Sequence, residues 1–163
     1  MVEDNQFLTF FSNEEVFGIR ILQVKEIKEY AEVTAIPLMP EFVKGVINLR
    51  GNVVPIIDLP IRFGREKTLI TKRTCIIILE VSHDSESLDI GILVDAVSEV
   101  IEIPKNMIEP TPSFGSKIRN DFIMGIGKLE QRFVILLDIN KVLSVGELSM
   151  LEENILQETT EHS

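Results

Sequence analysis

The sequence predicts a mainly β protein made of two small β-barrels packed together, with a C-terminal helix. Short runs of apolar and β-branched residues alternate with turn residues, which is typical of small barrels and sandwiches. The same order of runs occurs twice. The chain has 163 residues, 45% of them hydrophobic, which suffices for one domain or for two small subdomains that share a core.

An internal repeat supports this division. The segment from Gly18 to Ile27 matches the segment from Gly91 to Val100, 73 residues later. Further on, matching residues lie 80 apart: Phe42, Gly45, Leu49, Val54 and Asp58 over Phe122, Gly125, Leu129, Val134 and Asp138. Each half is marginal alone, so the two must bury apolar surface against each other. We predict one domain over 1–163, with barrels at 14–73 and 74–146 and a helix and tail at 147–163. The strand at 6–11 can join the second barrel.

In the first half, strands are predicted at 7–11 and 16–19 around a turn. Apolar residues at positions 21, 24 and 27 predict a helix of one to two turns. Asp58 is placed to cap a helical turn over 59–63 that Gly64 ends. The polar and basic segment 65–73 is a linker or an exposed loop.

In the second half, strands are predicted at 74–81 and 89–94, with a polar turn between them. Residues 97–103 are extended or briefly helical. Prolines then break the chain, and 111–120 is predicted to be loop. A buried strand follows at 133–137. Ser144 and Glu147 form a capping-box pattern before the C-terminal helix, whose apolar face carries Leu148, Leu151 and Ile155.

The hairpin within 42–64 is the segment around which the chain is organised. Gly51 and Asn52 tolerate the positive φ of tight turns, so we predict the corner there. Pro55 has no N–H to donate, and a four-residue loop would place it at a non-hydrogen-bonded pair. We therefore prefer that loop to a two-residue one. One face of the hairpin is predicted to enter the core, through Ile47, Leu49, Val54 and Ile56.

Arg50, at the tip of this hairpin, points away from the core in this prediction, into a partly apolar outer surface. Two interpretations stay open: a binding residue, or a surface arginine whose stem covers apolar neighbours. The second half has Glu130, Gln131 and Arg132 where the first has Arg50, Gly51 and Asn52. This difference suggests that the first tip has its own role.

The composition excludes several classes of function. The net charge of −10 argues against nucleic acid or anionic membranes as main partners and favours a soluble protein that meets other proteins. A single cysteine, Cys75, allows no internal disulfide and no cysteine pair for zinc, which fits a reducing cytoplasm. We find no signal peptide and no apolar run long enough to span a bilayer.

We also find no catalytic constellation. The duplicated Asp58 and Asp138 suggest an aspartic-protease dyad, but neither is followed by the small hydroxyl residue and glycine of such sites. The helix-cap interpretation is much stronger. His83 lies in a tight turn with serines and Asp84, where a triad geometry cannot form. The sequence thus predicts a binding module with no metal and no cofactor.

The chain resembles the CheW family of bacterial chemotaxis coupling proteins. The likeness rests on four segments in order, which together cover nearly the whole chain: FGIRILQVKEI, VKGVINLRGNVVPIIDL, GILVDAVSEV and MGIGKLEQRFVILLDINKVL. It implies two five-stranded SH3-like barrels and a non-catalytic adaptor. The adaptor would bridge the cytoplasmic tip of a methyl-accepting chemoreceptor and the regulatory domain of the histidine kinase CheA. Pairing with other CheW-like domains could build rings in receptor arrays.

The resemblance also implies a receptor site in a groove between the barrels, formed here by Val24, Glu26, Arg50, Cys75 and Val100. Arg50 would give an orienting charge, the three apolar residues a floor for a helix, and Glu26 would hold Arg50 or meet the receptor. Two positions depart from the family: Pro60 replaces a residue that is often basic, and Cys75 replaces an aliphatic one. A coupler in a non-chemotactic array, such as one for twitching motility, is the alternative. A small-ligand or hydrolytic domain that uses the cleft between the barrels is a weaker one.

Overall fold

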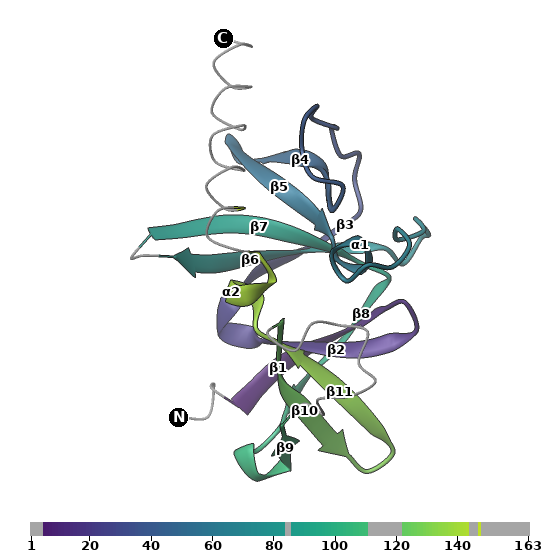
Figure 1. The fold of residues 1–163 in the computed structure, drawn as a ribbon, viewed down its shortest axis with the longest axis vertical. Helices are drawn as coiled ribbons and strands as arrows, with labels where there is room; N and C mark the ends of the chain where they lie inside the picture. Colours follow the sequence, from purple (N-terminus) through teal and green to yellow (C-terminus); the bar gives the residue numbers. More distant parts are fainter. Residues whose placement is uncertain (1–4, 84–85, 111–121, 144–146, 148–163) are drawn as a thin grey trace.

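The computed structural model describes residues 5–83, 86–110, 122–143 and 147, and their strands form two curved sheets stacked end to end (Figure 1). The mainly β class is confirmed. The six-stranded sheet has the order β8 (Ala96–Glu102), β1 (Gln6–Ser12), β2 (Glu15–Arg20), β11 (Arg132–Leu137), β10 (Ile123–Leu129) and β9 (Ile108–Glu109). The five-stranded sheet has the order β3 (Val24–Glu29), β6 (Cys75–His83), β7 (Glu86–Val94), β5 (Asn52–Asp58) and β4 (Val43–Leu49).

The helical elements are short: the α-helices α1 (Leu59–Arg62) and α2 (Ile139–Val142), and the 3₁₀ turns η2 (Ile21–Gln23) and η3 (Lys105–Met107). The loop predicted at 111–120 lies outside the described residues. So does the C-terminal helix and tail predicted at 147–163, except for Glu147.

Each sheet combines strands from both repeats. The β1–β2 hairpin joins β8, β10 and β11 of the second repeat, and the β6–β7 hairpin joins β3, β4 and β5 of the first. The predicted division into 14–73 and 74–146 was therefore wrong about which strands pair. A repeat in the sequence identifies segments with the same local structure, but it does not say which copies pair with each other.

The registers of the two sheets correspond to each other. Ile56 stands beside Gly91 where β5 and β7 run parallel, and Leu136 stands beside Gly18 where β11 and β2 run parallel. A Cβ on Gly91 would lie 2.6 Å from Ile56 Cδ1, and one on Gly18 would lie 2.8 Å from Leu136 Cδ2. The glycine recurs in the sequence because a large side chain of the parallel neighbour fills its side-chain space in both sheets.

Both sheets also close in the same way. After β3, at one edge of the five-stranded sheet, the chain continues to Thr34, which bridges to Val46 on β4 at the other edge. In the six-stranded sheet the chain continues from β8 to β9, where Glu109 pairs with Ile126 on β10. Val46 and Ile126 are 80 residues apart, as the repeat requires.

The strands bury both faces, so the molecule has three apolar clusters. One lies within the five-stranded sheet and includes Leu49, Val54 and Ile56, as predicted for that face of the hairpin. A second lies within the six-stranded sheet and includes Phe7, Val134 and Leu136. The largest lies between the sheets and includes Ile57 and Leu137 from the opposite faces of β5 and β11. The hairpin face that carries Arg50 was predicted to point outward, but it is exposed only near the tip, because Pro55 and Ile57 on the same face are buried.

The helix predicted from positions 21, 24 and 27 was wrong. Only Ile21–Gln23 is helical, and β3 begins at Val24 and pairs with β6. The β3–β6 register shifts between Val24 and Glu26, as at a bulge, so the strand breaks the simple alternation that identifies strands in a sequence. Val24 and Glu26 are therefore strand residues.

The corner of the β4–β5 hairpin is Arg50-Gly51, and Asn52 is the first residue of β5. Both the predicted corner at Gly51-Asn52 and the four-residue loop were wrong. Arg50 has φ 51° and Gly51 has φ 86°, the combination of a two-residue type I′ turn, and the Gly51 N–H donates to Asn48 Oδ1 (2.9 Å). Arg50 itself takes the left-handed conformation that we expected of Asn52.

Pro55 nevertheless occupies the kind of position that it requires. It stands opposite Val46, whose N–H and carbonyl exchange hydrogen bonds with Thr34 on the other side (2.8 and 3.0 Å). The Val46–Pro55 pair is therefore a non-hydrogen-bonded one, and Pro55 needs no N–H.

Asp58 does not cap α1. Its side chain makes no hydrogen bond to the start of the helix, although α1 has the predicted position and Gly64 follows it with φ 79°. The Asp58 carboxylate, 2% exposed, instead accepts hydrogen bonds from Thr68, at 2.7 Å from Oγ1 and 3.1 Å from N. The cap prediction failed because a loop donor ten residues later satisfies this carboxylate. Asp138 also makes no cap bond and lies 3.9 Å from Lys141 Nζ.

Candidate protein-binding site

The tip of the β4–β5 hairpin touches strand β3. Arg50 Nη2 lies 2.7 Å from Glu26 Oε2, and Lys28 Nζ lies 4.0 Å from Glu26 Oε1. The two edge regions of the five-stranded sheet thus meet through an ion pair. Glu26 was expected either to hold Arg50 or to contact the receptor, and the observed ion pair corresponds to the first of these roles.

Most of the Arg50 side chain remains in solvent. Its exposed fraction is 73%, against 26% for Glu26, while Val46 and Val53 nearby on the hairpin are half-buried. An ion pair this exposed contributes at most about 1 kcal/mol to stability. The larger effect of the ion pair is to orient the Arg50 guanidinium, which keeps further N–H donors for a binding partner.

The remaining predicted site residues are divided between the two sheets. Val24 on β3 and Cys75 on β6 are half-buried and pack against the cluster between the sheets. Val100 lies on β8 of the six-stranded sheet and is 48% exposed. Val97 on the same strand packs against that cluster too. Pro60 is buried in α1 and offers no exposed side chain in place of a basic one.

The second repeat contains a related ion pair that sequence reasoning missed. Glu99 on β8 is the repeat equivalent of Glu26, and its Oε1 lies 3.4 Å from Arg132 Nη2. Arg132 corresponds to Asn52 in the repeat, not to Arg50. The glutamate is thus duplicated while its arginine comes from a different position of the hairpin. The shared glutamate at matching positions was the signal that could have revealed this pair.

The other lysine of β3, Lys25, is held by acidic side chains of β6 and β7. Lys25 Nζ lies 3.0 Å from Asp89 Oδ2 and 3.8 Å from Glu80 Oε2. The hydrogen bond and the charge of Asp89 raise the pKa of the Lys25 ammonium above its ordinary value of 10.5. Lys25 is therefore fully charged at neutral pH and is already occupied by its own sheet.

Groups for catalysis are not assembled in the described part of the chain. Asp58 is occupied by Thr68, and Asp58 ends β5 of one sheet whereas Asp138 follows β11 of the other. Among the described residues, no cluster of three His, Cys, Asp or Glu side chains could hold a metal ion. Within those residues, too, no helix is long and apolar enough to cross a membrane.

Comparison with known proteins decides the family. The CheW-like domain model matches residues 6–147. This chain belongs to the CheW family. Proteins of the CheW family are non-catalytic coupling adaptors of bacterial chemotaxis, so the predicted adaptor function without enzymatic activity is confirmed.

Several CheW proteins are similar over most of their length. The Chemotaxis protein CheW of Klebsiella aerogenes is 39% identical over 147 residues, which cover 90% of this chain and 86% of that protein. The Chemotaxis protein CheW of Treponema pallidum is 36% identical over 156 residues, which cover 92% and 89%. The crystal structure of the scaffolding protein TtCheW from Thermoanaerobacter tengcongensis superposes with a TM-score of 0.78 at 37% identity, covering 88% of this chain and 90% of that one.

Proposed function

We propose that this protein links the cytoplasmic tip of a methyl-accepting chemoreceptor to the regulatory domain of a CheA-type histidine kinase. It does so in the cytoplasm, at membrane-associated receptor arrays, and without chemical turnover. Family membership supports this role, as do the net charge of −10 and the use of Asp58 for loop structure. Further CheW-like domains can join the same assembly by pairing of sheets, and rings result where such contacts close.

The Arg50–Glu26 pair is the observation that carries the proposal. Arg50 is 73% exposed, is held at 2.7 Å by Glu26, and stands on a turn whose left-handed backbone does not favour arginine. A charged residue that has a strained backbone and makes no contribution to the core is expected at a binding site, where a partner uses its charge. Arg50 therefore supplies the orienting contact to the receptor.

The apolar part of the proposed receptor site consists of Val24, Cys75 and Val100. Val24 and Cys75 lie at the margin of the cluster between the sheets, and Val100 offers a half-exposed side chain on the other sheet. A receptor helix laid between the sheets would cover these side chains with its apolar stripe. Arg50 would then meet polar groups at the edge of that helix.

The test is a titration of the full chain against a receptor tip fragment and, separately, against a kinase regulatory domain. Wild type is expected to bind both and to form a ternary complex. Arg50→Gly suits the left-handed turn and removes the charge, so it should weaken receptor binding at least tenfold and leave kinase binding unchanged.

Arg132→Ala is the matched control, because it removes the other arginine that pairs with a repeat-equivalent glutamate. This variant should bind the receptor fragment as wild type does. Equal receptor affinity for wild type and Arg50→Gly would remove Arg50 from the site. Binding to neither partner by wild type would overturn the coupling function for this chain.

A further inference from the structure

A second exposed surface lies on the loop of residues 65–73, which connects α1 to β6. Figure 1 shows this loop at the far end of β5 from the β4–β5 turn. At about 3.3 Å per residue, the seven residues of β5 separate the two ends by about 23 Å. The 65–73 loop is thus distinct from the Arg50–Glu26 pair.

Two aliphatic side chains at the centre of this loop face solvent. Leu69 is 74% exposed and Ile70 is 44% exposed, whereas Thr68, immediately before them, is 5% exposed. A flexible loop could turn such side chains inward and reduce their contact with water. This loop is prevented from doing so by its hydrogen bonds.

The backbone is anchored on both sides of the aliphatic pair. On one side the Thr68 N–H and hydroxyl donate to the buried Asp58 carboxylate (3.1 and 2.7 Å). On the other side the Thr71 N–H donates to Thr74 Oγ1 (2.8 Å), and the Thr74 N–H donates to the Thr71 carbonyl (3.3 Å). Leu69 and Ile70 are therefore presented to solvent by a preorganised backbone, which lowers the entropy lost when a partner binds.

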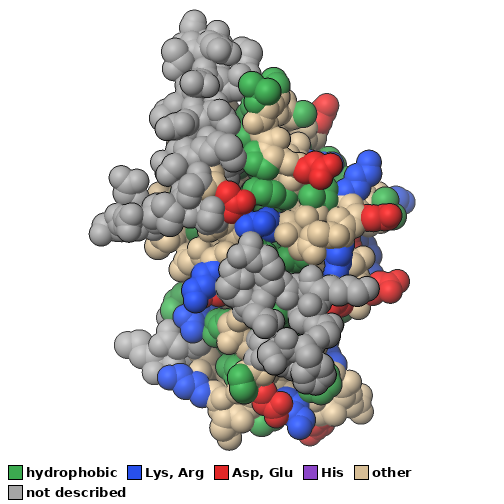
Figure 2. All heavy atoms as spheres, viewed as in Figure 1, with side chains coloured by type: hydrophobic (Ala, Val, Ile, Leu, Met, Phe, Trp, Pro, Cys, Tyr) green, Lys and Arg blue, Asp and Glu red, His purple; other side chains and the backbone are tan. Residues whose placement is uncertain are grey.

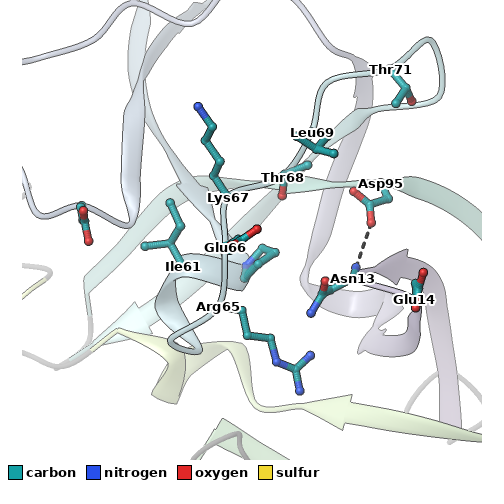
Figure 3. Close-up of a pocket in the computed structure, with 12 residues that line it drawn as sticks. Asn13, Glu14, Ile61, Arg65, Glu66, Lys67, Thr68, Leu69, Thr71 and Asp95 are labelled. Carbon is teal, nitrogen blue, oxygen red and sulfur yellow. Dashed lines mark hydrogen bonds between the residues drawn. The ribbon is translucent and has the colours of Figure 1, made fainter.

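A hollow of about 740 Å³ lies beside the loop (Figure 3). Lys67, Thr68 and Leu69 line it on the loop side, and the β1–β2 turn at Asn13 and Glu14 lines it on the other. The facing turn is fixed as well, because the Asn13 N–H donates to Asp95 Oδ2 (2.8 Å). A smaller hollow of about 660 Å³ continues past Lys72 and Arg73 and shares Thr71 and Asp95 with the first.

The loop is basic in a protein of net charge −10. Residues 65–73 contain four basic side chains and one acidic one, Glu66. Arg65 is paired with Glu15, whereas Lys67, Lys72 and Arg73 are exposed and take part in none of the ion pairs found among the described residues. In Figure 2, Lys and Arg side chains lie beside Asp and Glu side chains at the right-hand edge of the molecule, where Figure 1 draws this loop.

We propose that the 65–73 loop is a docking site for an acidic protein segment that carries aliphatic side chains. An aliphatic side chain of the segment packs against Leu69 in the hollow, and its carboxylates meet Lys67, Lys72 and Arg73. The acidic side chains Glu14, Glu41 and Asp95 also line the hollow, so the carboxylates of the segment approach from the side of the loop. An anionic membrane fits less well, because three cations do not offset the repulsion of so acidic a protein.

The test uses the ¹⁵N-labelled full chain and a synthetic peptide of repeated Glu-Leu-Glu units, with a Lys-Leu-Lys peptide as the charge-reversed probe. The acidic peptide is expected to shift the amide signals of residues 65–74 and of the Asn13–Glu14 turn. The affinity should fall severalfold when salt is raised from 0.05 to 0.5 M, because exposed ion pairs are screened. The basic peptide should not shift these signals.

Two pairs of substitutions separate the contributions. Leu69→Ser with Ile70→Ser removes the aliphatic contact, and Lys67→Glu with Lys72→Glu reverses the charge. Each pair should weaken acidic-peptide binding at least tenfold and leave the unfolding midpoint unchanged, since all four side chains are exposed. Leu38→Ser is the control, because Leu38 is 94% exposed in a different loop.

Three results would overturn the proposal: acidic-peptide shifts that lie elsewhere on the protein, equal binding of the basic peptide, or unchanged affinity in both double variants. Binding to phosphatidylglycerol vesicles that depends on Lys67 and Lys72 would assign the loop to a membrane surface instead. Receptor and kinase titrations of the same variants show whether either partner uses this loop, and they are independent of the Arg50 test.

Discussion

Arg62 donates a hydrogen bond from Nε to the carbonyl of Val142 across 2.7 Å, and these two residues occupy the same position in the two repeats. Both lie on the short helices that follow β5 and β11. The Arg62 guanidinium also stacks between two repeat-equivalent rings, 5.0 Å from the centroid of Phe42 and 4.8 Å from that of Phe122. The Arg62 guanidinium therefore lies where the two repeats meet, and the second repeat has an uncharged residue, Val142, at the equivalent position.

Arg62→Met is expected to lower the free energy of unfolding by about 2–3 kcal/mol. Methionine keeps the apolar packing between the rings but loses the bond to Val142 and the ion pair with Glu147 (3.0 Å). The Arg62 side chain is only 14% exposed, so water does not replace these partners freely. Urea unfolding measures the change. Arg20→Met, at an exposed end of β2, is the control, and an equal effect of both would contradict this account.

Asp58 gives a second prediction, in which the observed contact differs from the helix cap expected from the sequence. Asp58→Asn keeps one oxygen for the Thr68 hydroxyl but places an amide N–H against the Thr68 N–H, so we expect a loss of about 1–2 kcal/mol. Asp58→Ala leaves both Thr68 donors unsatisfied and should lose more. A helix cap would tolerate asparagine. Unfolding curves of both variants and of Thr68→Val distinguish the loop anchor from the helix cap. An Asp58→Asn variant as stable as wild type would contradict the loop anchor.

The sequence predicts the strands and the faces they bury, but it does not predict that each sheet contains strands from both repeats. Alternation placed Ile47, Leu49, Val54 and Ile56 on one inward face, because this pattern depends only on neighbours along the chain. Each sheet contains a hairpin from the other repeat, and the two hairpins, β1–β2 and β6–β7, are similar in sequence pattern. Which hairpin joins each sheet is decided by long-range packing, such as that of Ile56 over Gly91, and no local pattern records it.

The candidate site could be predicted only in part for a similar reason. Arg50 was recognised as unusual from its position at a hairpin tip, but its contact with Glu26 joins the β4–β5 turn at one edge of a sheet to β3 at the opposite edge. On β3, moreover, Glu26 is half-buried while its apolar neighbour Ile27 is 45% exposed, which reverses the usual alternation. Resemblance to a family supplied Glu26 as a site residue, and periodicity did not.

Gly45 provides a test of sheet closure. A Cβ at this position would lie 2.2 Å from the Thr34 carbonyl oxygen, which is backbone and cannot rotate away. Gly45→Ala should therefore break the Thr34–Val46 bridge and destabilise the protein by about 3 kcal/mol or more. At the equivalent Gly125 the nearest atom is Ile108 Cγ2 at 2.7 Å, a side chain that can move, so Gly125→Ala should cost about 1–2 kcal/mol. Thermal unfolding and hydrogen exchange at Val46 measure both effects, and equal losses would contradict the difference between the two closures.

The turn at Arg50 allows stability and binding to be separated. A left-handed backbone costs a residue with a Cβ about 1–2 kcal/mol, and asparagine is among the residues that tolerate it best. Arg50→Asn should therefore leave the free energy of unfolding unchanged or raise it by up to about 1 kcal/mol, although the exposed pair with Glu26 is lost.

The same substitution should weaken binding to a receptor tip fragment, because the orienting charge is gone. Glu26→Gln, alone and combined with Arg50→Asn, completes a double-mutant cycle that measures the ion pair itself. We expect a coupling of less than about 1 kcal/mol in unfolding. A loss of more than about 1 kcal/mol of stability in Arg50→Asn would mean that arginine is retained here for the fold, and the case for a binding role at this hairpin would then lose its physical basis.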